Sequence, residues 1–230
     1  MQVRQIPIHN IIRSLEELVK YTSKERNKTS VLAIAGGSGS GKSVIAEYIA
    51  SKSSDAVIIS IDDYFRGSIK RADNIKDFDH PDCYNLAKVN LDLRMLKAKK
   101  EIEKPTYDKA TKKHGRETVK TRDNTIIIIE GLHALNLMVR GEIDFGVFVD
   151  VDPDIRWDRR VFRDMQKFRK ANNTFEYSIE KIRKIWKVAE IIYYQEIAPT
   201  QNYANFIINN DKPSKILNSD QAAQSTPRIV

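Results

Sequence analysis

Eight residues near the start of the chain have the types and the spacing to bind a polyphosphate. Residues 36–43 contain Gly36-x-x-x-x-Gly41-Lys42-Ser43 between an apolar run and a helix-like segment. Glycines let backbone N–H groups point inward at phosphate oxygens, and the following helix adds its N-terminal donors. Lys42 would contact the β- and γ-phosphates, and the Ser43 hydroxyl would bind a bridging Mg²⁺. The predicted phosphate contacts are Gly36, Gly37, Ser38, Gly39, Ser40, Gly41, Lys42 and Ser43; the alternative is a Gly/Ser-rich loop without a ligand.

Carboxylates follow two further predicted strands. Asp62 and Asp63 come after the strand AVIIS (56–60), and Glu130 ends TIIIIE (125–130). Glu130 could hold Mg²⁺ directly or through its water shell, so we place it in a metal site with Ser43 and Asp62. Asp62 could also accept the proton of an attacking hydroxyl. The alternative is that each carboxylate only caps nearby backbone.

These residues need a scaffold that brings strand ends together. Apolar runs alternating with helical patterns predict a five-stranded parallel α/β sheet flanked by helices. The carboxyl ends of such strands share one ligand-binding edge. The predicted strands are 31–35, 56–60, 125–130, 145–151 and 205–209, and the predicted helices are 10–28, 44–50, 86–100 with Asn85 as N-cap, one opening at Asp152-Pro153, and 175–197, with a loop or small hairpin over 104–124.

The same apolar and helical patterns predict how the chain is organised. We expect an N-terminal helix packed on the core within 1–29, a kinase-like P-loop domain over 30–211, and a polar tail over 212–230. A helical lid is expected at about 156–175 and a substrate-side insertion at about 62–124.

The composition of the chain indicates the cellular compartment in which the protein is expected. No run of about 18 apolar residues is present, and the N-terminus does not read as a signal peptide. Cys83 is the single cysteine, which excludes a disulfide within the chain. These features favour the cytoplasm and no membrane partner.

The net charge of +8 is concentrated in one region. Residues 153–187 hold eleven Lys and Arg against five Asp and Glu, a net +6. Such a patch suits an anionic small molecule as well as a nucleic acid backbone. Because it coincides with the expected lid, we favour the small molecule and do not expect nucleic acid as a partner.

Six motifs in matching order resemble the uridine kinase and phosphoribulokinase family. They are GGSGSGKS (36–43), SIDDYF (60–65), DFDHPDCY (77–84), PTYD (105–108), IIIIEGLHAL (126–135) and DPDIRWDRRVFRD (152–164). The P-loop marks only a large superfamily, whereas SIDDYF and FDHPD are more specific. The motifs span about residues 31–210, nearly the whole chain.

The resemblance implies a nucleoside-monophosphate-kinase-like fold with a mobile lid, the cofactors ATP and Mg²⁺, and transfer of the γ-phosphate to a primary hydroxyl. It implies Asp62 as base and Asp79 as ligand of ribose hydroxyls, a role that suits a carboxylate accepting two hydrogen bonds. Lys42 and Arg163 complete the expected catalytic set. The expected substrate contacts are Tyr64, Phe78, Asp79, Tyr107, Lys109, Lys112, Arg160, Arg163 and Lys170. For Phe78 a core role is an equal alternative.

Departures from the family pattern concern the base-binding segment and the lid. Lys109 and Lys112 stand where uridine kinases usually have an aromatic residue and a histidine. The lid lacks one arginine and the glycine of RD-x-x-x-R-G-R. Arg156 and Arg159 are expected to be solvated, and His133 to be a packed histidine at a helix start rather than a substrate contact.

Three functions remain open at this point. The first is an ATP-dependent uridine or cytidine kinase, which SIDDYF and FDHPD favour. The second is a kinase of another hydroxylated substrate such as a pentose phosphate, which Lys109, Lys112, Lys113 and EGLH favour. The third is a nucleotide-dependent switch or nucleic-acid-associated ATPase, favoured only by charge. Relatives are often oligomers, but one sequence reveals no interface.

Overall fold

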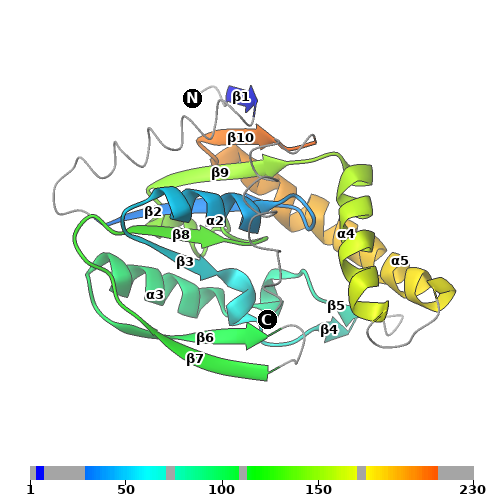
Figure 1. Ribbon diagram of the computed structural model, residues 1–230, viewed down its shortest axis with the longest axis horizontal. Coiled ribbons are helices and arrows are strands. Elements are labelled where there is room, and N and C mark those ends of the chain that lie inside the picture. The colour runs from blue at the N-terminus through cyan, green and yellow to red at the C-terminus, as the bar shows by residue number, and fades with distance from the viewer. Residues whose placement is uncertain (1–3, 8–28, 71–75, 109–112, 170–174, 212–230) are drawn as a thin grey trace, which may run out of the picture.

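The computed structural model describes residues 4–7, 29–70, 76–108, 113–169 and 175–211. Its centre is a parallel six-stranded sheet (Figure 1). In spatial order the strands are β1 (Arg4–Pro7), β10 (Phe206–Asn209), β9 (Phe145–Asp150), β2 (Ser30–Gly36), β8 (Ile126–Glu130) and β3 (Ala56–Ser60). The five predicted strands are confirmed, and with them the predicted α/β fold.

The sixth strand, β1, was not expected from the sequence. It pairs in parallel with β10 at the edge of the sheet, with Ile6 opposite Ile208. Its four residues include Arg4 and Pro7 and form no apolar run, so the strand depends on its neighbour rather than on local pattern. The predicted helix over 10–28 and the tail over 212–230 lie outside the described residues.

Helices cover both faces of the sheet. Alternate isoleucines of β8 point to opposite faces, because successive strand residues do so. Ile126 and Ile128 pack with Ile45 and Ile49 of α2 (Lys42–Lys52), whereas Ile127 belongs to the core under the other helices. That second core includes α3 (Leu86–Lys97) and the end of α5 (Phe175–Ile192). The sheet is therefore buried on both faces, as its apolar strands predict.

Smaller elements connect the strands and helices of the main fold. Strands β6 (Ile102–Asp108) and β7 (Lys113–Val119) form an antiparallel hairpin, which confirms the hairpin reading of 104–124. The predicted cap of α3 is also confirmed, since Asn85 accepts a hydrogen bond from the Lys88 N–H at 3.2 Å. The short elements are η1 (Ile61–Tyr64), β4 (Ile69–Lys70), β5 (Lys76–Asp77), η2 (Pro81–Cys83), η3 (Arg140–Glu142), the π-helical turn η4 (Tyr193–Ile197) and η5 (Ala198–Tyr203).

Helix α4 (Pro153–Arg169) stands across the carboxyl end of the sheet, beyond the tip of β9 (Figure 1). It begins at the predicted Asp152-Pro153 pair, and Asp152 accepts a hydrogen bond from the Asp154 N–H at 2.8 Å. This placement directs arginines of α4 at the loop between β2 and α2. Within the described residues, no helix is long and apolar enough to cross a membrane.

Candidate active site

A cavity of about 620 Å³ lies where the P-loop, β3, β8 and α4 converge. Its wall combines phosphate-loop residues, acidic residues, aromatic rings and arginines. Among the predicted site residues, those lining it are Ser38, Gly39, Gly41, Lys42, Ser43, Asp62, Phe78, Asp79, Tyr107, Glu130, Arg160 and Arg163. Gly36, Gly37 and Ser40 shape the loop without lining the cavity. Lys109, Lys112 and Lys170 lie outside the described residues.

The P-loop adopts a backbone that only glycine takes easily. Gly39 has φ +82° and Gly41 φ +92°, both in the left-handed region. A Cβ on Gly39 would also lie 2.7 Å from the carbonyl oxygen of Arg156. The Lys42 ammonium reaches back across the loop and donates to the Gly37 carbonyl at 2.8 Å. The loop therefore wraps around the position of the lysine charge, as phosphate binding requires.

Two hydroxyls meet one carboxylate beside this loop. Ser43 donates to Oε2 of Glu130 at 3.0 Å, and Ser60 donates to Oε1 at 2.6 Å. Hydroxyl and carboxylate oxygens are the hard ligands that Mg²⁺ prefers, so Ser43 and Glu130 fit that ion. The described residues contain no cluster of three or more His, Cys, Asp or Glu suited to a metal. Water and phosphate oxygens would therefore have to complete the coordination.

The two neighbouring aspartates of η1 point in different directions. Asp62 lines the cavity. Asp63 instead pairs with Lys104 at 2.8 Å and accepts the backbone N–H of Tyr107 at 3.1 Å. Of the two, Asp62 is therefore the carboxylate that can reach a ligand.

Asp79 is held rigidly at the other side of the cavity. Its backbone N–H donates to Oδ1 of Asp77 at 2.9 Å, which fixes the turn after β5. Burial raises the pKa of the Asp79 carboxyl, and the positive charge of Arg160 opposes that rise. The carboxylate is thus buried beside a cation and faces the space in which a ligand would lie.

Aromatic rings form the wall near Asp79. Phe65 stacks on Phe78 with ring centroids 6.4 Å apart and lies 5.3 Å from the ring of Tyr107. Tyr84 contacts Phe65 edge-on at 5.7 Å. Phe78 and Tyr107 line the cavity as expected. Phe65 and Tyr84 also line it; sequence reasoning missed them, although they end the motifs SIDDYF and DFDHPDCY.

His133 is fully buried behind Asp79. Its Nε2 lies 2.7 Å from the Asp79 carbonyl oxygen, so the neutral ring donates there. Burial lowers the pKa of His133 to about 4, and the hydrogen bond to Asp79 opposes this only partly. The expectation of a packed histidine is confirmed, although the residue lies in a turn after β8 rather than at a helix start.

Arginines of α4 lie next to the P-loop. Arg160 donates to the Ser38 hydroxyl at 2.8 Å and to Asp164 at 2.6 Å. Arg163, about half exposed, also donates to Asp164, at 3.2 Å. Burial alone would lower the pKa of Arg160, but the carboxylates of Asp79 and Asp164 raise it. Fixed positive charge therefore lies beside the phosphate loop.

The expectation that Arg156 and Arg159 are solvated is wrong. Arg156 is 1% exposed, pairs with Glu190 at 2.8 Å and lies 4.0 Å above the ring of Tyr193. Arg159 donates to the carbonyl oxygens of Gly39 at 3.4 Å and Asn210 at 2.8 Å. Helical spacing places Arg159 and Arg156 four and seven residues before Arg163, on the same side of α4, and their partners come from distant segments. Arg159 thus holds the P-loop by a hydrogen bond, whereas Arg156 packs against Gly37 and Gly39.

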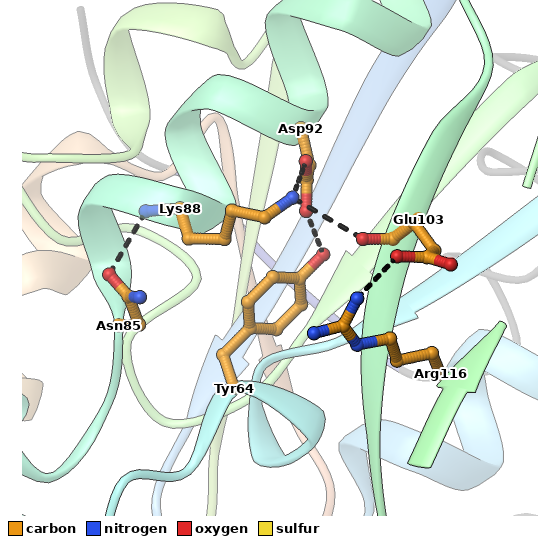
Figure 2. Close-up of polar contacts among 6 residues, drawn as sticks. All are labelled: Tyr64, Asn85, Lys88, Asp92, Glu103 and Arg116. Carbon is orange, nitrogen blue, oxygen red and sulfur yellow. Dashed lines mark hydrogen bonds and ion pairs between the residues drawn. The ribbon is translucent and has the colours of Figure 1, made fainter. Parts of the chain in front are cut away.

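The expected substrate contact of Tyr64 is also wrong. Its side chain is 2% exposed and its hydroxyl donates to Asp92 of α3 at 2.9 Å (Figure 2). The turn of η1 sends Asp62 toward the cavity and Tyr64 into the core.

Comparison with known proteins identifies the family. The sequence model of the "Phosphoribulokinase / Uridine kinase family" matches residues 31–216. The chain belongs to this family. It is 36% identical to the uridine kinase of Borrelia duttonii (strain Ly), over 82% of the chain and 92% of that relative. It is 34% identical to the uridine kinase of Lactobacillus helveticus (strain DPC 4571), over 79% and 86%.

Solved structures support the same fold. A structure described as a possible uridine kinase from Bacillus stearothermophilus matches with TM-score 0.55 and 22% identity, over 85% of this chain and 99% of that one. Phosphoribulokinase from Rhodobacter spheroides matches with TM-score 0.54 and 17% identity, over 77% and 68%. The chain is accordingly a small-molecule kinase with the P-loop kinase fold.

Proposed function

We propose that this kinase transfers the γ-phosphate of ATP to a hydroxyl of a nucleoside, with uridine and cytidine as acceptors and UMP and CMP as products. One observation carries the proposal: Asp62 and Asp79 line the same cavity as Lys42 of the P-loop. A base, a diol ligand and a phosphate site are then within reach of one bound pair of substrates. The named uridine kinases among the relatives support the pyrimidine nucleoside.

The proposed transfer joins the acceptor hydroxyl to the γ-phosphorus and releases ADP. Asp62 accepts the proton of the acceptor hydroxyl while the oxygen of that hydroxyl forms a bond to the γ-phosphorus. The bond from that phosphorus to the β–γ bridging oxygen breaks, and ADP leaves. Lys42, Arg160 and Arg163 supply positive charge to the oxygens of the transferring group.

Ser43 and Glu130 would hold Mg²⁺ at the P-loop. When bound, the ion neutralises phosphate charge and orients the β- and γ-oxygens. Ser60 holds the second oxygen of Glu130, so the carboxylate keeps one orientation. Asp62 was also expected in the metal site. We propose that its main role is that of the base.

One wall of the cavity favours a nucleoside. This acceptor wall consists of Phe65, Phe78, Asp79 and Tyr107. Asp79 can accept two hydroxyl hydrogen bonds from a ribose cis-diol. Phe65, Phe78 and Tyr107 offer ring faces and edges to a base, which a sugar phosphate would not use. We further propose that residues 30–211 form the kinase domain, with the segment of about 62–124 supplying this acceptor wall and about 156–175 serving as its lid.

A coupled ADP-release screen over nucleosides, pentoses and pentose phosphates tests this function, with product identification by chromatography. Uridine or cytidine should give the 5′-monophosphate with ATP, and Lys42→Ala should give none. Turnover of a pentose phosphate with inert nucleosides would replace the proposal by a phosphoribulokinase-like activity. ATP hydrolysis without any phosphorylated acceptor would support a P-loop switch or ATPase instead.

A further inference from the structure

The side chains of Asp63 and Tyr64, which follow Asp62, are both linked to strand β6. Asp63 contacts it directly, and Tyr64 does so through Asp92 and Lys88. Asp62, Asp63 and Tyr64 are consecutive in the single turn of η1. Asp62 lines the cavity, whereas the other two side chains leave it in different directions. The anchors therefore flank the position from which the proposed base acts.

The first anchor is a buried network around Tyr64 (Figure 2). The Tyr64 hydroxyl donates to Oδ2 of Asp92, a carboxylate that is 1% exposed, while Lys88 donates to Oδ1. Lys88 also reaches the backbone carbonyl of Glu103 on β6, at 3.4 Å. A buried carboxylate with charged and hydroxyl donors is costly to disturb, because each lost donor leaves it unsatisfied.

The second anchor is the ion pair of Asp63. Its Oδ2 lies 2.8 Å from the Lys104 ammonium, and its Oδ1 accepts the backbone N–H of Tyr107 at 3.1 Å. Lys104 is 5% exposed and also pairs with Glu117 of β7 at 3.0 Å. Burial alone would lower the pKa of Lys104, but its hydrogen bonds to Asp63 and Glu117 raise it. The lysine therefore stays charged at neutral pH.

Both anchors converge on the strand that carries part of the acceptor wall. Glu103, Lys104 and Tyr107 all belong to β6, and Tyr107 lines the cavity. The hairpin and η1 are thus tied side by side through side chains as well as backbone. A shift of the hairpin would be transmitted directly to η1.

We propose that Asp63 and Tyr64 are positioning residues, which lock Asp62 to the hairpin that contacts the acceptor so that the base and the hydroxyl keep one geometry. This inference rests on the proposed role of Asp62 as base. Misplacement of a reacting group by about 1 Å can cost 10²-fold in rate, so small shifts of η1 would be visible in kcat.

A double-mutant cycle separates positioning from a structural role. Lys104→Met removes the cation but keeps an unbranched apolar stem, and it should lower kcat for uridine about tenfold or more while leaving the KM for ATP unchanged. In the Asp62→Asn background the same change should have no further effect, because the base it positions is already gone. Lys104→Arg should restore part of kcat.

Lys97→Met is the matched control. It removes a similar lysine–aspartate pair, Lys97 with Asp144 at 3.2 Å, at the amino end of β9 and away from the cavity. It should leave kcat unchanged in both backgrounds. Tyr64→Phe, which conserves volume, repeats the test from the other anchor if Lys104→Met does not fold.

The outcomes are distinct for the two proposals. If the wild type phosphorylates no hydroxyl acceptor, or if Asp62→Asn is as active as the wild type, the proposed function fails. If Asp62→Asn is impaired but Lys104→Met and Tyr64→Phe keep the wild-type kcat, the positioning role is overturned. Equal losses in both backgrounds would also overturn it, since the anchors would then act on the fold alone.

Discussion

The phosphate end and the acceptor end of the cavity are built in different ways. The phosphate end is one continuous stretch, the P-loop with the start of α2, braced by arginines of α4. The acceptor end combines η1, the turn after β5 and the β6–β7 hairpin. Backbone groups and glycine conformation dominate the first, and side chains from separate segments dominate the second.

This difference determines how each end tolerates change. Apart from proline, a substitution leaves the backbone donor in place, so mutations at the phosphate end act mainly at a few charged or glycine positions. At the acceptor end the cavity is lined by side chains from separate segments, which other side chains and backbone groups hold in place. We therefore expect mutations at the phosphate end to abolish transfer, and mutations at the acceptor end to change its rate or its selectivity.

The largest effect is expected at the phosphate end. Lys42→Ala should lower kcat/KM by about 10³-fold or more, because the lysine supplies charge to the transferring phosphate. The variant should still fold, because the lysine supplies charge to the phosphate site rather than packing in the apolar core. Thermal melting checks the fold. Full turnover by a folded Lys42→Ala protein would break the assignment of the P-loop as the donor site.

The next effect distinguishes the adjacent aspartates of η1. Asp62→Asn should reduce kcat at least about 10²-fold with little change in ATP binding, as loss of a general base typically does. Asp63→Asn should cost less, because Asp63 acts through Lys104 and the hairpin. Steady-state kinetics with uridine measures both. A larger loss for Asp63→Asn would mean that the roles of the two residues are reversed.

The smallest effect on activity is expected behind Asp79, at His133, where the readout is stability. Its folded pKa of about 4 lies below the ordinary value of about 6.5, so the unfolded chain binds more protons between these pH values. Stability from neutral His133 is present above pH 6.5 and is lost as the pH falls toward 4. The full loss is about 3 kcal/mol.

Denaturant unfolding of the wild type and His133→Gln between pH 7 and 4 measures this contribution. The variant, which keeps a donor for the Asp79 carbonyl, should lose less stability on acidification. His114→Gln is the control, because that histidine lies exposed on β7. Parallel pH profiles for all three proteins would show that His133 does not titrate as its burial implies.

The same contrast explains what could be predicted from the sequence. The P-loop follows from a contiguous pattern with fixed spacing, and the order of strands and helices follows from apolar periodicity. Asp62 and Glu130 were placed because strand ends in a parallel sheet share an edge. The family resemblance supplied Asp79, Phe78 and Tyr107, whose positions no local pattern reveals.

The predictions that were wrong concern side chains whose position depends on residues far away in the sequence. Helical spacing alone could not show that Glu190 and Tyr193 enclose Arg156, or that Arg159 reaches Asn210. The direction of Tyr64 depends on Asp92, which lies 28 residues away. The edge strand β1 depends on β10 across most of the chain.

The most direct test of the division between donor and acceptor ends is calorimetric titration of Asp79→Asn with uridine and, separately, with a non-hydrolysable ATP analogue and Mg²⁺. The Kd for uridine should rise about 10- to 100-fold, the size of lost hydrogen bonds to a charged group, while the Kd for the nucleotide stays within about twofold of the wild type. Wild-type protein with 2′-deoxyuridine should show a similar weakening. An unchanged Kd for uridine, or equal weakening of both ligands, would contradict the account.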